Sequence, residues 1–141
     1  MAEDDGRRWI PTEHPLLREM DKQAEPARRE LVNRGLLVTE AEMCAHLGLE
    51  PAALHQKVEK SCLFTLCIGE SLFYPAFYGN PKLPREGIER VSKVLGDLPD
   101  WAKWMFFMRK NLNLDGHSPL ELLEQGDIEE VERAAYSYRN G

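Results

Sequence analysis

The sequence has no apolar stretch long enough to cross a bilayer. Its longest hydrophobic runs, such as residues 62–68, fall far short of the ~20 residues that a membrane-spanning helix needs. The first five residues are acidic overall, which is the wrong sign for the start of a secretory signal. We therefore expect a cytoplasmic protein that does not bind a membrane.

Cysteine is scarce as well. The chain of 141 residues holds Cys44, Cys62 and Cys67, an odd number that favours reduced thiols over a disulfide framework. A zinc site is disfavoured because Cys44 and His46 lie two residues apart on a predicted helix and point to different sides. Cys62 and Cys67 are five apart on a predicted strand and face opposite ways. We expect no metal and no other cofactor.

No part of the chain is strongly basic. Residues 1–34 carry seven basic and eight acidic side chains, residues 35–83 three and five, and residues 84–141 eight and eleven, for a net charge of −6. Affinity for a phosphate backbone comes mainly from clustered lysine and arginine. This composition weakens the case for nucleic-acid binding without excluding it.

A catalytic set of residues is also missing. The histidines are scattered, and the only one beside a hydroxyl, His117, precedes Ser118 in a predicted turn. There the serine is better explained as a helix cap than as a nucleophile, which needs a base and an orienting carboxylate. No glycine-rich phosphate loop follows a predicted strand. We therefore expect a protein that is not an enzyme.

Helical patterns cover most of the chain. Residues 1–13 predict a loose charged arm, and apolar residues at three- and four-residue spacing predict an amphipathic helix from Pro15 to Arg34. Pro26 predicts either a kink or a junction of two shorter helices, and Gly35 marks the stop.

The next region predicts a helix-turn-helix. A capping-box pattern at residues 39–42 opens a short helix through Leu47, and Gly48 permits a sharp turn. Glu50-Pro51 starts a second helix through about Lys60. Two short helices joined by a glycine-containing turn are the elements of this motif.

A β-hairpin should follow. Residues 63–68 and 72–74 are β-prone and flank Gly69-Glu70-Ser71, and Pro75 should end the second strand or confine it to an edge. Residues 78–84 have the composition of a linker, so we place the boundary between two lobes there.

The C-terminal lobe predicts four helices. The first is apolar on one face, at Ile88, Val91, Val94 and Leu95, and ends at Gly96. The second combines Trp101, Met105 and Met108 at helical spacing with Trp104, Phe106 and Phe107 on other sides. A helix that is apolar nearly all round must be enclosed, and we interpret the rings as core, with a homodimer seam and a ligand pocket as alternatives.

The last two helices form a tight corner. Ser118-Pro119-Leu120-Glu121 predicts a capped helix start, and Gly126 should end that helix. Asp127-Ile128-Glu129-Glu130 then repeats an acidic cap for the final helix, whose apolar stripe is Ile128, Val131, Ala135 and Tyr138.

The middle region resembles excisionase-like and winged helix-turn-helix DNA-binding modules. The matching residues are Thr39, Glu42, Leu47, Gly48, Leu54, Val58 and the hairpin ending Phe73-Tyr74-Pro75. The resemblance implies contact with the DNA major groove by exposed positions of the second helix, namely His55, Gln56, Lys57 and Lys60. The alternative is that the two helices only build a core, since Glu50 and Glu59 beside them would repel phosphates.

The C-terminal lobe resembles the toxin-binding domain of antitoxins in the Xre/MbcA/ParS family. The match covers about residues 85–141 and includes Asn111, Leu114, Gly116, residues 118–123, Gly126, Val131, Tyr138 and Gly141. The resemblance implies that this domain follows a helix-turn-helix region and docks on a toxin that consumes NAD. Phe106, Leu112 and Asp115 stand where the family commonly has tryptophan, proline and glycine.

Together these patterns predict a mainly α protein, with a helix-turn-helix and small hairpin wing before a C-terminal helical lobe. Its predicted domains are residues 1–35, 36–83 and 84–141. The predicted partner-binding residues are Asn111, Asp115, Gly116, His117, Ser118, Arg133, Tyr136 and Arg139. The alternative is that Tyr138 is core and both arginines are only solvated.

The leading functional hypothesis is an antitoxin-like regulator that binds and neutralises a protein toxin through residues 111–141, with DNA binding by the middle region left open. The alternatives are a DNA-binding or adaptor protein without a toxin and, third, a small-ligand sensor that uses the aromatic helix. We also expect a homodimer, because helix-turn-helix proteins commonly pair to read two half-sites.

Overall fold

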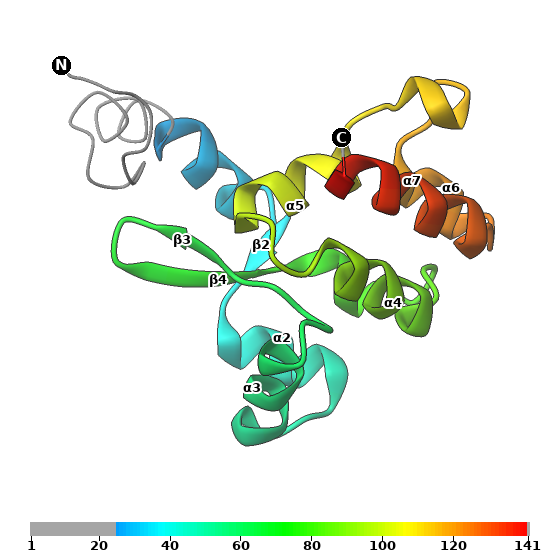
Figure 1. The fold of residues 1–141 in the computed structure, drawn as a ribbon. Helices are drawn as coiled ribbons and strands as arrows, with labels where there is room; N and C mark the ends of the chain where they lie inside the picture. Colours follow the sequence, from blue (N-terminus) through cyan, green and yellow to red (C-terminus); the bar gives the residue numbers. More distant parts are fainter. Residues whose placement is uncertain (1–24, 141) are drawn as a thin grey trace, which may run out of the picture.

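The computed structural model describes residues 25–140, which are mainly helical with a small antiparallel sheet (Figure 1). Residues 25–33 are helical, and the elements that follow are β2 (Leu37–Val38), α2 (Glu40–Leu47), α3 (Pro51–Glu59), β3 (Leu66–Ile68), β4 (Ser71–Pro75), η2 (Ala76–Gly79), α4 (Arg85–Leu95), α5 (Asp100–Met108), η3 (Leu112–Leu114), α6 (Pro119–Glu124) and α7 (Ile128–Asn140). The predicted mainly α class is confirmed. Within residues 25–140, no helix is both long enough and apolar enough to span a membrane.

The described part of the first predicted helix ends as expected. Gly35 has φ +78°, and the N–H of Leu36 donates to the carbonyl of Leu31 at 2.9 Å, which closes the helix end. The predicted arm and the predicted start at Pro15 lie outside the described residues. The predicted kink at Pro26 falls at their border.

The helix pair α2 and α3 follows the predicted bounds closely. Thr39 Oγ1 accepts from the N–H of Glu42 at 3.2 Å, and Glu42 Oε1 accepts from the N–H of Thr39 at 2.8 Å. That backbone hydrogen bond lowers the pKa of the Glu42 carboxyl. Gly48 has φ +68° at the turn, and Pro51 opens α3.

The sheet differs from the predicted hairpin in two ways. Its order is β2-β4-β3, so β4 lies at the centre and a strand that was not predicted, β2, pairs with it. The predicted strand over residues 63–68 is wrong in its first half, since β3 begins only at Leu66, opposite Phe73. Pro75 ends β4 and has no N–H to donate, and the N–H of Ala76 makes the last bond of this pair, to the carbonyl of Leu36 at 2.9 Å. Cys62 therefore does not lie on a strand.

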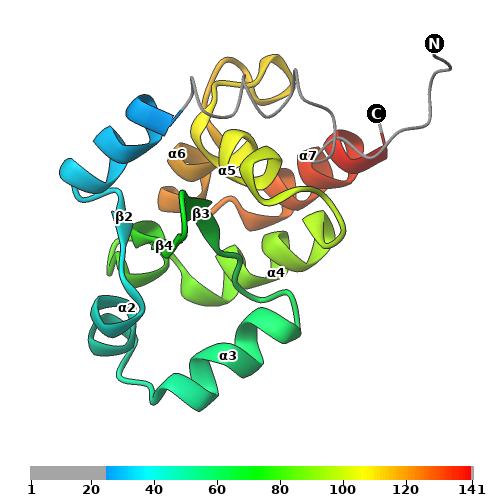
Figure 2. The same cartoon turned by 90° about the vertical axis from the view of Figure 1, so that its left-hand side faces the viewer.

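The C-terminal helices pack beside the sheet, with α4 lying along α7 (Figures 1 and 2). The approach at Gly87 is close, because a methyl group there would lie 2.8 Å from Ile128 Cδ1. On α5 the buried face is Trp104, Phe106 and Phe107, while Met105 from the other predicted stripe is 38% exposed.

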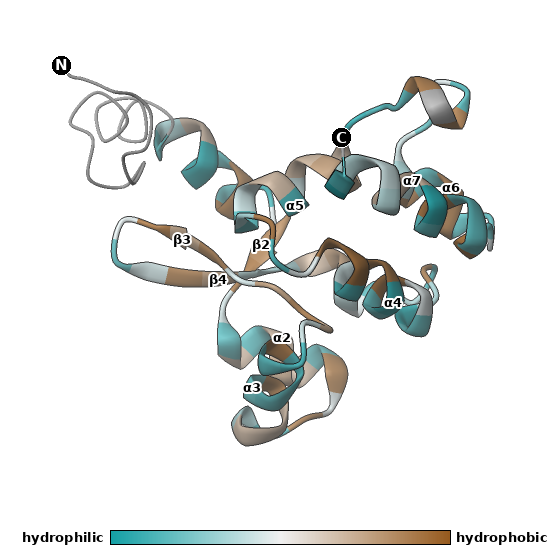
Figure 3. Ribbon diagram, viewed as in Figure 1, coloured by the Kyte–Doolittle hydropathy of each residue, from teal (hydrophilic) through white to brown (hydrophobic). Residues whose placement is uncertain are grey.

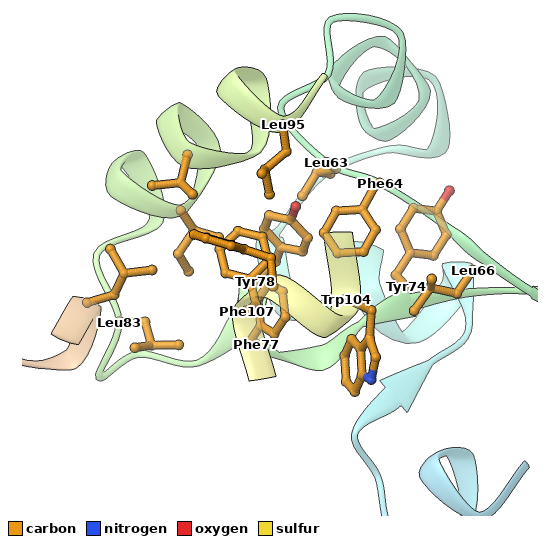
Figure 4. Close-up of a cluster of buried hydrophobic side chains, with 14 of the residues drawn as sticks. Leu63, Phe64, Leu66, Tyr74, Phe77, Tyr78, Leu83, Leu95, Trp104 and Phe107 are labelled. Carbon is orange, nitrogen blue, oxygen red and sulfur yellow. The ribbon is translucent and has the colours of Figure 1, made fainter. Parts of the chain in front are cut away.

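A single hydrophobic cluster crosses the predicted boundary at residues 78–84. The ring of Phe77 lies 4.9 Å from that of Phe107, and the rings of Phe64 and Phe107 stack at 6.0 Å (Figure 4). Phe77 and Tyr78 belong to the buried helix η2, so the start of the predicted linker is structured. The division into three domains stays a prediction. Described residues from all three ranges lie in this cluster or pack against it. Trp104, Phe106 and Phe107 of α5 are core, as interpreted from the sequence, whereas Trp101 is only partly buried and packs against the cluster.

Candidate protein-binding surface

The loop between α5 and α6 closes on itself. The N–H of Asn111 donates to the carbonyl of His117 at 3.0 Å, and the N–H of Gly116 donates to the carbonyl of Asn111 at 3.0 Å. Asp115 and Gly116 turn the chain with φ of +56° and +81°. The predicted residues Asn111, Asp115, Gly116 and His117 therefore belong to one compact turn. Figure 1 shows this loop standing out above α6 and α7.

The same loop exposes one large apolar side chain. Leu112 is 93% exposed, whereas Leu114, two residues later, is 3% exposed. The short helix η3 packs against α7, and Leu114 belongs to the hydrophobic cluster. Burial of Leu114 fixes the base of the loop and leaves Leu112 outside. Sequence reasoning did not include Leu112 among the candidate contact residues, although it noted the departure from the family there.

Ser118 has a structural task. It is 8% exposed, and its Oγ accepts from the N–H of Glu121 at 3.2 Å. Glu121 Oε1 in turn accepts from the N–H of Ser118 at 2.7 Å, which lowers the pKa of the Glu121 carboxyl. The prediction that Ser118 contacts a partner is therefore corrected, because its hydroxyl is buried and caps α6. His117 stays exposed, with Nδ1 3.8 Å from Glu121 Oε1.

The turn at Gly126 before α7 has the predicted form. Gly126 has φ +87°, its N–H donates to the carbonyl of Leu123 at 2.9 Å, and the N–H of Asp127 donates to the carbonyl of Leu122 at 3.0 Å. These bonds satisfy the last carbonyls of α6 and set the direction of α7.

Helix α7 has one buried face and one outward face. Val131, Ala134 and Ala135 are buried, whereas the side chain of Arg133 is 70% exposed and Tyr136 is 53% exposed. Arg133 Nη2 lies 3.1 Å from Glu130 Oε1 on the same helix. Figure 3 shows hydrophilic residues along the visible side of this helix. Arg133 and Tyr136 are thus accessible, as predicted.

The end of α7 is tied to its neighbours. The Tyr138 hydroxyl donates to the carbonyl of Ala102 at 3.1 Å, and its ring lies 5.2 Å from that of Phe106. Arg139 Nη1 donates to the carbonyl of Val94 at 3.3 Å, and Nη2 lies 3.6 Å from Asp97 Oδ2. Arg139 therefore links α7 to the end of α4 and also forms part of the outer surface.

A shallow groove runs between α4 and α7. It has a volume of about 270 Å³, and its lining is Arg90, Lys93, Val94, Glu132, Tyr136 and Arg139. Arg90 Nη2 lies 2.6 Å from Glu132 Oε1, so that pair neutralises itself. Among the described residues Lys93 has no ion-pair partner, which leaves a free cation beside Tyr136.

The predicted DNA-contacting residues on α3 fall into two groups. Gln56 and Lys60 are exposed, and Figure 2 places α3 at the edge of the molecule. Lys57 Nζ lies 2.9 Å from Glu89 Oε2, with side-chain exposures of only 30% and 16%. The prediction that Lys57 is an exposed DNA-contacting position is corrected, because its side chain faces α4. The exposed ring of His55 contacts the carboxylate of Glu40.

Within residues 25–140, no group of three or more histidine, cysteine or acidic side chains is placed to hold a metal ion. The thiols of Cys44, Cys62 and Cys67 are free. Burial raises the pKa of the Cys44 thiol. Tyr74 donates to Glu40 Oε1 at 3.5 Å, and burial raises its pKa to about 12. These groups do not form a nucleophile with a base and an orienting partner.

Comparisons of the chain with protein families, curated proteins and solved structures find no match.

Proposed function

We propose that the protein is an antitoxin-like regulator, which binds and neutralises a protein toxin through its C-terminal helices. One observation carries the proposal: residues 111–140 expose Leu112 on the loop and Arg133 and Tyr136 on α7, all on a closely packed support. Exposed aromatic and arginine side chains commonly dominate the binding energy of protein interfaces. The resemblance of residues 85–141 to a toxin-binding domain supports the partner class, an enzyme that consumes NAD.

The support for these side chains is preorganised. The loop is closed by the bridge between Asn111 and His117, and α7 begins from a hydrogen-bonded corner at Gly126. A binding surface that is already ordered loses less conformational entropy when a partner docks. This arrangement favours a preformed contact surface over chemistry carried out by the tail itself.

The test uses the full chain with an NAD-consuming enzyme encoded beside its gene, and the absence of such a neighbouring gene would itself count against the proposal. We expect the paired variant Arg133→Glu/Tyr136→Ala to weaken the complex by about thirty-fold or more, because both substitutions remove exposed hot-spot groups. Affinity would be measured by calorimetry, and neutralisation by the cellular NAD level. Glu70→Ala, at the exposed hairpin turn, is the control and should leave both values unchanged. Equal affinity of the paired variant and the parent would contradict the proposal.

A second candidate function is DNA binding by the middle region. It is supported by the order of a helix, β2, α2, α3 and the hairpin, with β2 paired to β4, which suits a winged helix-turn-helix. It is also supported by the exposure of Gln56 on α3 and of Lys60 at its C-terminal end. Two of the other predicted contacts, His55 and Lys57, are engaged by carboxylates.

For this candidate we expect salt-sensitive binding to DNA upstream of the protein's own gene. Lys60→Ala should weaken binding and reduce the slope of log affinity against log salt by about 1, since it removes one phosphate contact. The matched control is Lys82→Ala, which changes an exposed lysine near η2. Fluorescence anisotropy over a series of salt concentrations measures the affinity and its salt dependence. The same slope in both variants and the parent would count against α3 as the contact helix.

A further inference from the structure

A pocket of about 390 Å³ lies where the middle region meets the C-terminal helices. Its lining comes from four places in the chain: Leu36 before β2, η2 and the turn after it, α5, and α6. A volume of this size lies within the range of small-ligand sites. None of the proposed partner contacts lines it, so it does not depend on the proposed function.

The wall of the pocket is apolar and aromatic. The rings of Phe77 and Trp104 stack with centroids 6.0 Å apart and planes 13° apart, and Leu83 and Met108 extend the wall. Phe77 and Trp104 also belong to the packed cluster shown in Figure 4. The wall is therefore held in place by the core and can bury the apolar body of a ligand.

The rim of the pocket is acidic. Glu121 and Glu124 of α6 both line it, and both are exposed. The hydrogen bond from the Ser118 N–H lowers the pKa of Glu121, and the nearby Lys110 and His117 lower it as well, so this carboxylate is ionised at neutral pH. Among residues 25–140, Glu124 has no cationic partner. The uncompensated charge at the mouth is therefore negative.

The wall also holds a polar group that lacks a partner. Trp104 is 5% exposed, and no acceptor within the described part of the chain bonds its indole N–H. Figure 4 shows the nitrogen on the side of the ring turned away from Phe77. A buried donor without an acceptor is costly, and an acceptor atom on a bound molecule would satisfy it.

We propose that this pocket binds an organic cation: an apolar body that carries an ammonium or guanidinium group and a nearby hydrogen-bond acceptor. The body lies against Phe77 and Trp104, the cation faces Glu124 and Glu121, and the acceptor takes the indole N–H of Trp104. A free aralkyl amine has this chemistry, and so does a lysine or arginine side chain beside a peptide carbonyl. An anion of the same shape is repelled by the rim.

The test follows the side-chain N–H signals of tryptophan by NMR in the full chain. The chain has 3 tryptophans, and Trp104→Phe identifies the signal that belongs to this pocket. The probes are 2-phenylethylamine, its uncharged analogue 2-phenylethanol, the acid 3-phenylpropanoate, and a blocked tetrapeptide that carries phenylalanine and lysine. We expect the cationic probes to shift the Trp104 signal at lower concentration than either analogue.

The variant Glu124→Gln should weaken binding of the cationic probes by about five-fold, since it removes the unpaired carboxylate. Glu59→Gln on α3, an exposed glutamate far from the pocket, is the matched control and should leave binding unchanged. Tighter binding of the free amine than of the peptide assigns the site to a small molecule, and the reverse assigns it to a protein side chain. Equal binding of the uncharged or acidic probe, or no shift by any probe, would overturn the proposal.

Discussion

Replacing Phe107 by alanine should lower the free energy of unfolding by about 3–5 kcal/mol, the usual cost of removing a buried aromatic ring. Phe107 is 0% exposed, and its ring contacts those of Phe64, Phe77 and Phe106 at 6.0, 4.9 and 5.6 Å. These contacts join the middle region to α5, so the cavity would open in the centre of the shared core. Urea unfolding followed by circular dichroism measures the change.

The control for this substitution lies on the same helix. Met105 is 38% exposed, so Met105→Ala should cost less than about 1 kcal/mol. Helix propensity changes little between the two variants, which isolates the effect of burial. If Phe107→Ala were no more harmful than Met105→Ala, the packing described for α5 would be wrong.

The second large effect concerns a buried polar pair. The hydroxyls of Tyr78 and Ser92 lie 2.6 Å apart, and each residue is 1% exposed. Burial raises the pKa of Tyr78 far above its ordinary value, so the phenol stays protonated. Tyr78→Phe should lower the free energy of unfolding by about 1–3 kcal/mol, because the Ser92 hydroxyl is left without a partner in the core.

A double-mutant cycle separates this bond from general packing. Tyr78→Phe/Ser92→Ala removes both polar groups, so its cost should be smaller than the sum of the two single costs. Chemical denaturation of the four proteins at neutral pH gives the coupling free energy. Strict additivity would mean that the two hydroxyls do not support each other.

Local features of the fold were predictable because their signals are short in sequence. The capping boxes at Thr39 and Ser118 each need only a few adjacent residues, and both are present as predicted. Strand β2 was not predicted because Leu37 and Val38 are too few to show an alternating pattern. Their strand exists only through pairing with Tyr74 and Pro75, far along the chain.

The start of the predicted linker was misjudged for a similar reason. Glycine, asparagine and proline in residues 78–84 are typical of loops, but composition does not record which side chains the loop inserts elsewhere. Phe77 and Tyr78 enter the core through contacts with α4 and α5, which only the folded chain brings near.

The candidate surface was predictable where helical periodicity defines it. The predicted stripe of the last helix leaves Arg133 and Tyr136 outside, as the structure has them. Of that stripe Val131 and Ala135 are buried, whereas Tyr138 is 40% exposed. Other features depend on distant partners: the pairing of Lys57 with Glu89 joins two helices, and the pocket collects residues from Leu36 to Glu124. Leu112 was missed because leucine is usually buried.

The ion pair between Lys57 and Glu89 has a mechanical consequence. It anchors α3 to α4, and α4 lies along α7 with the carbonyl of Val94 bonded to Arg139. A partner bound to the outer side of α7 would therefore meet α3 at one fixed orientation. If a partner joined two copies of the protein through α7, the distance between their α3 helices would therefore be fixed.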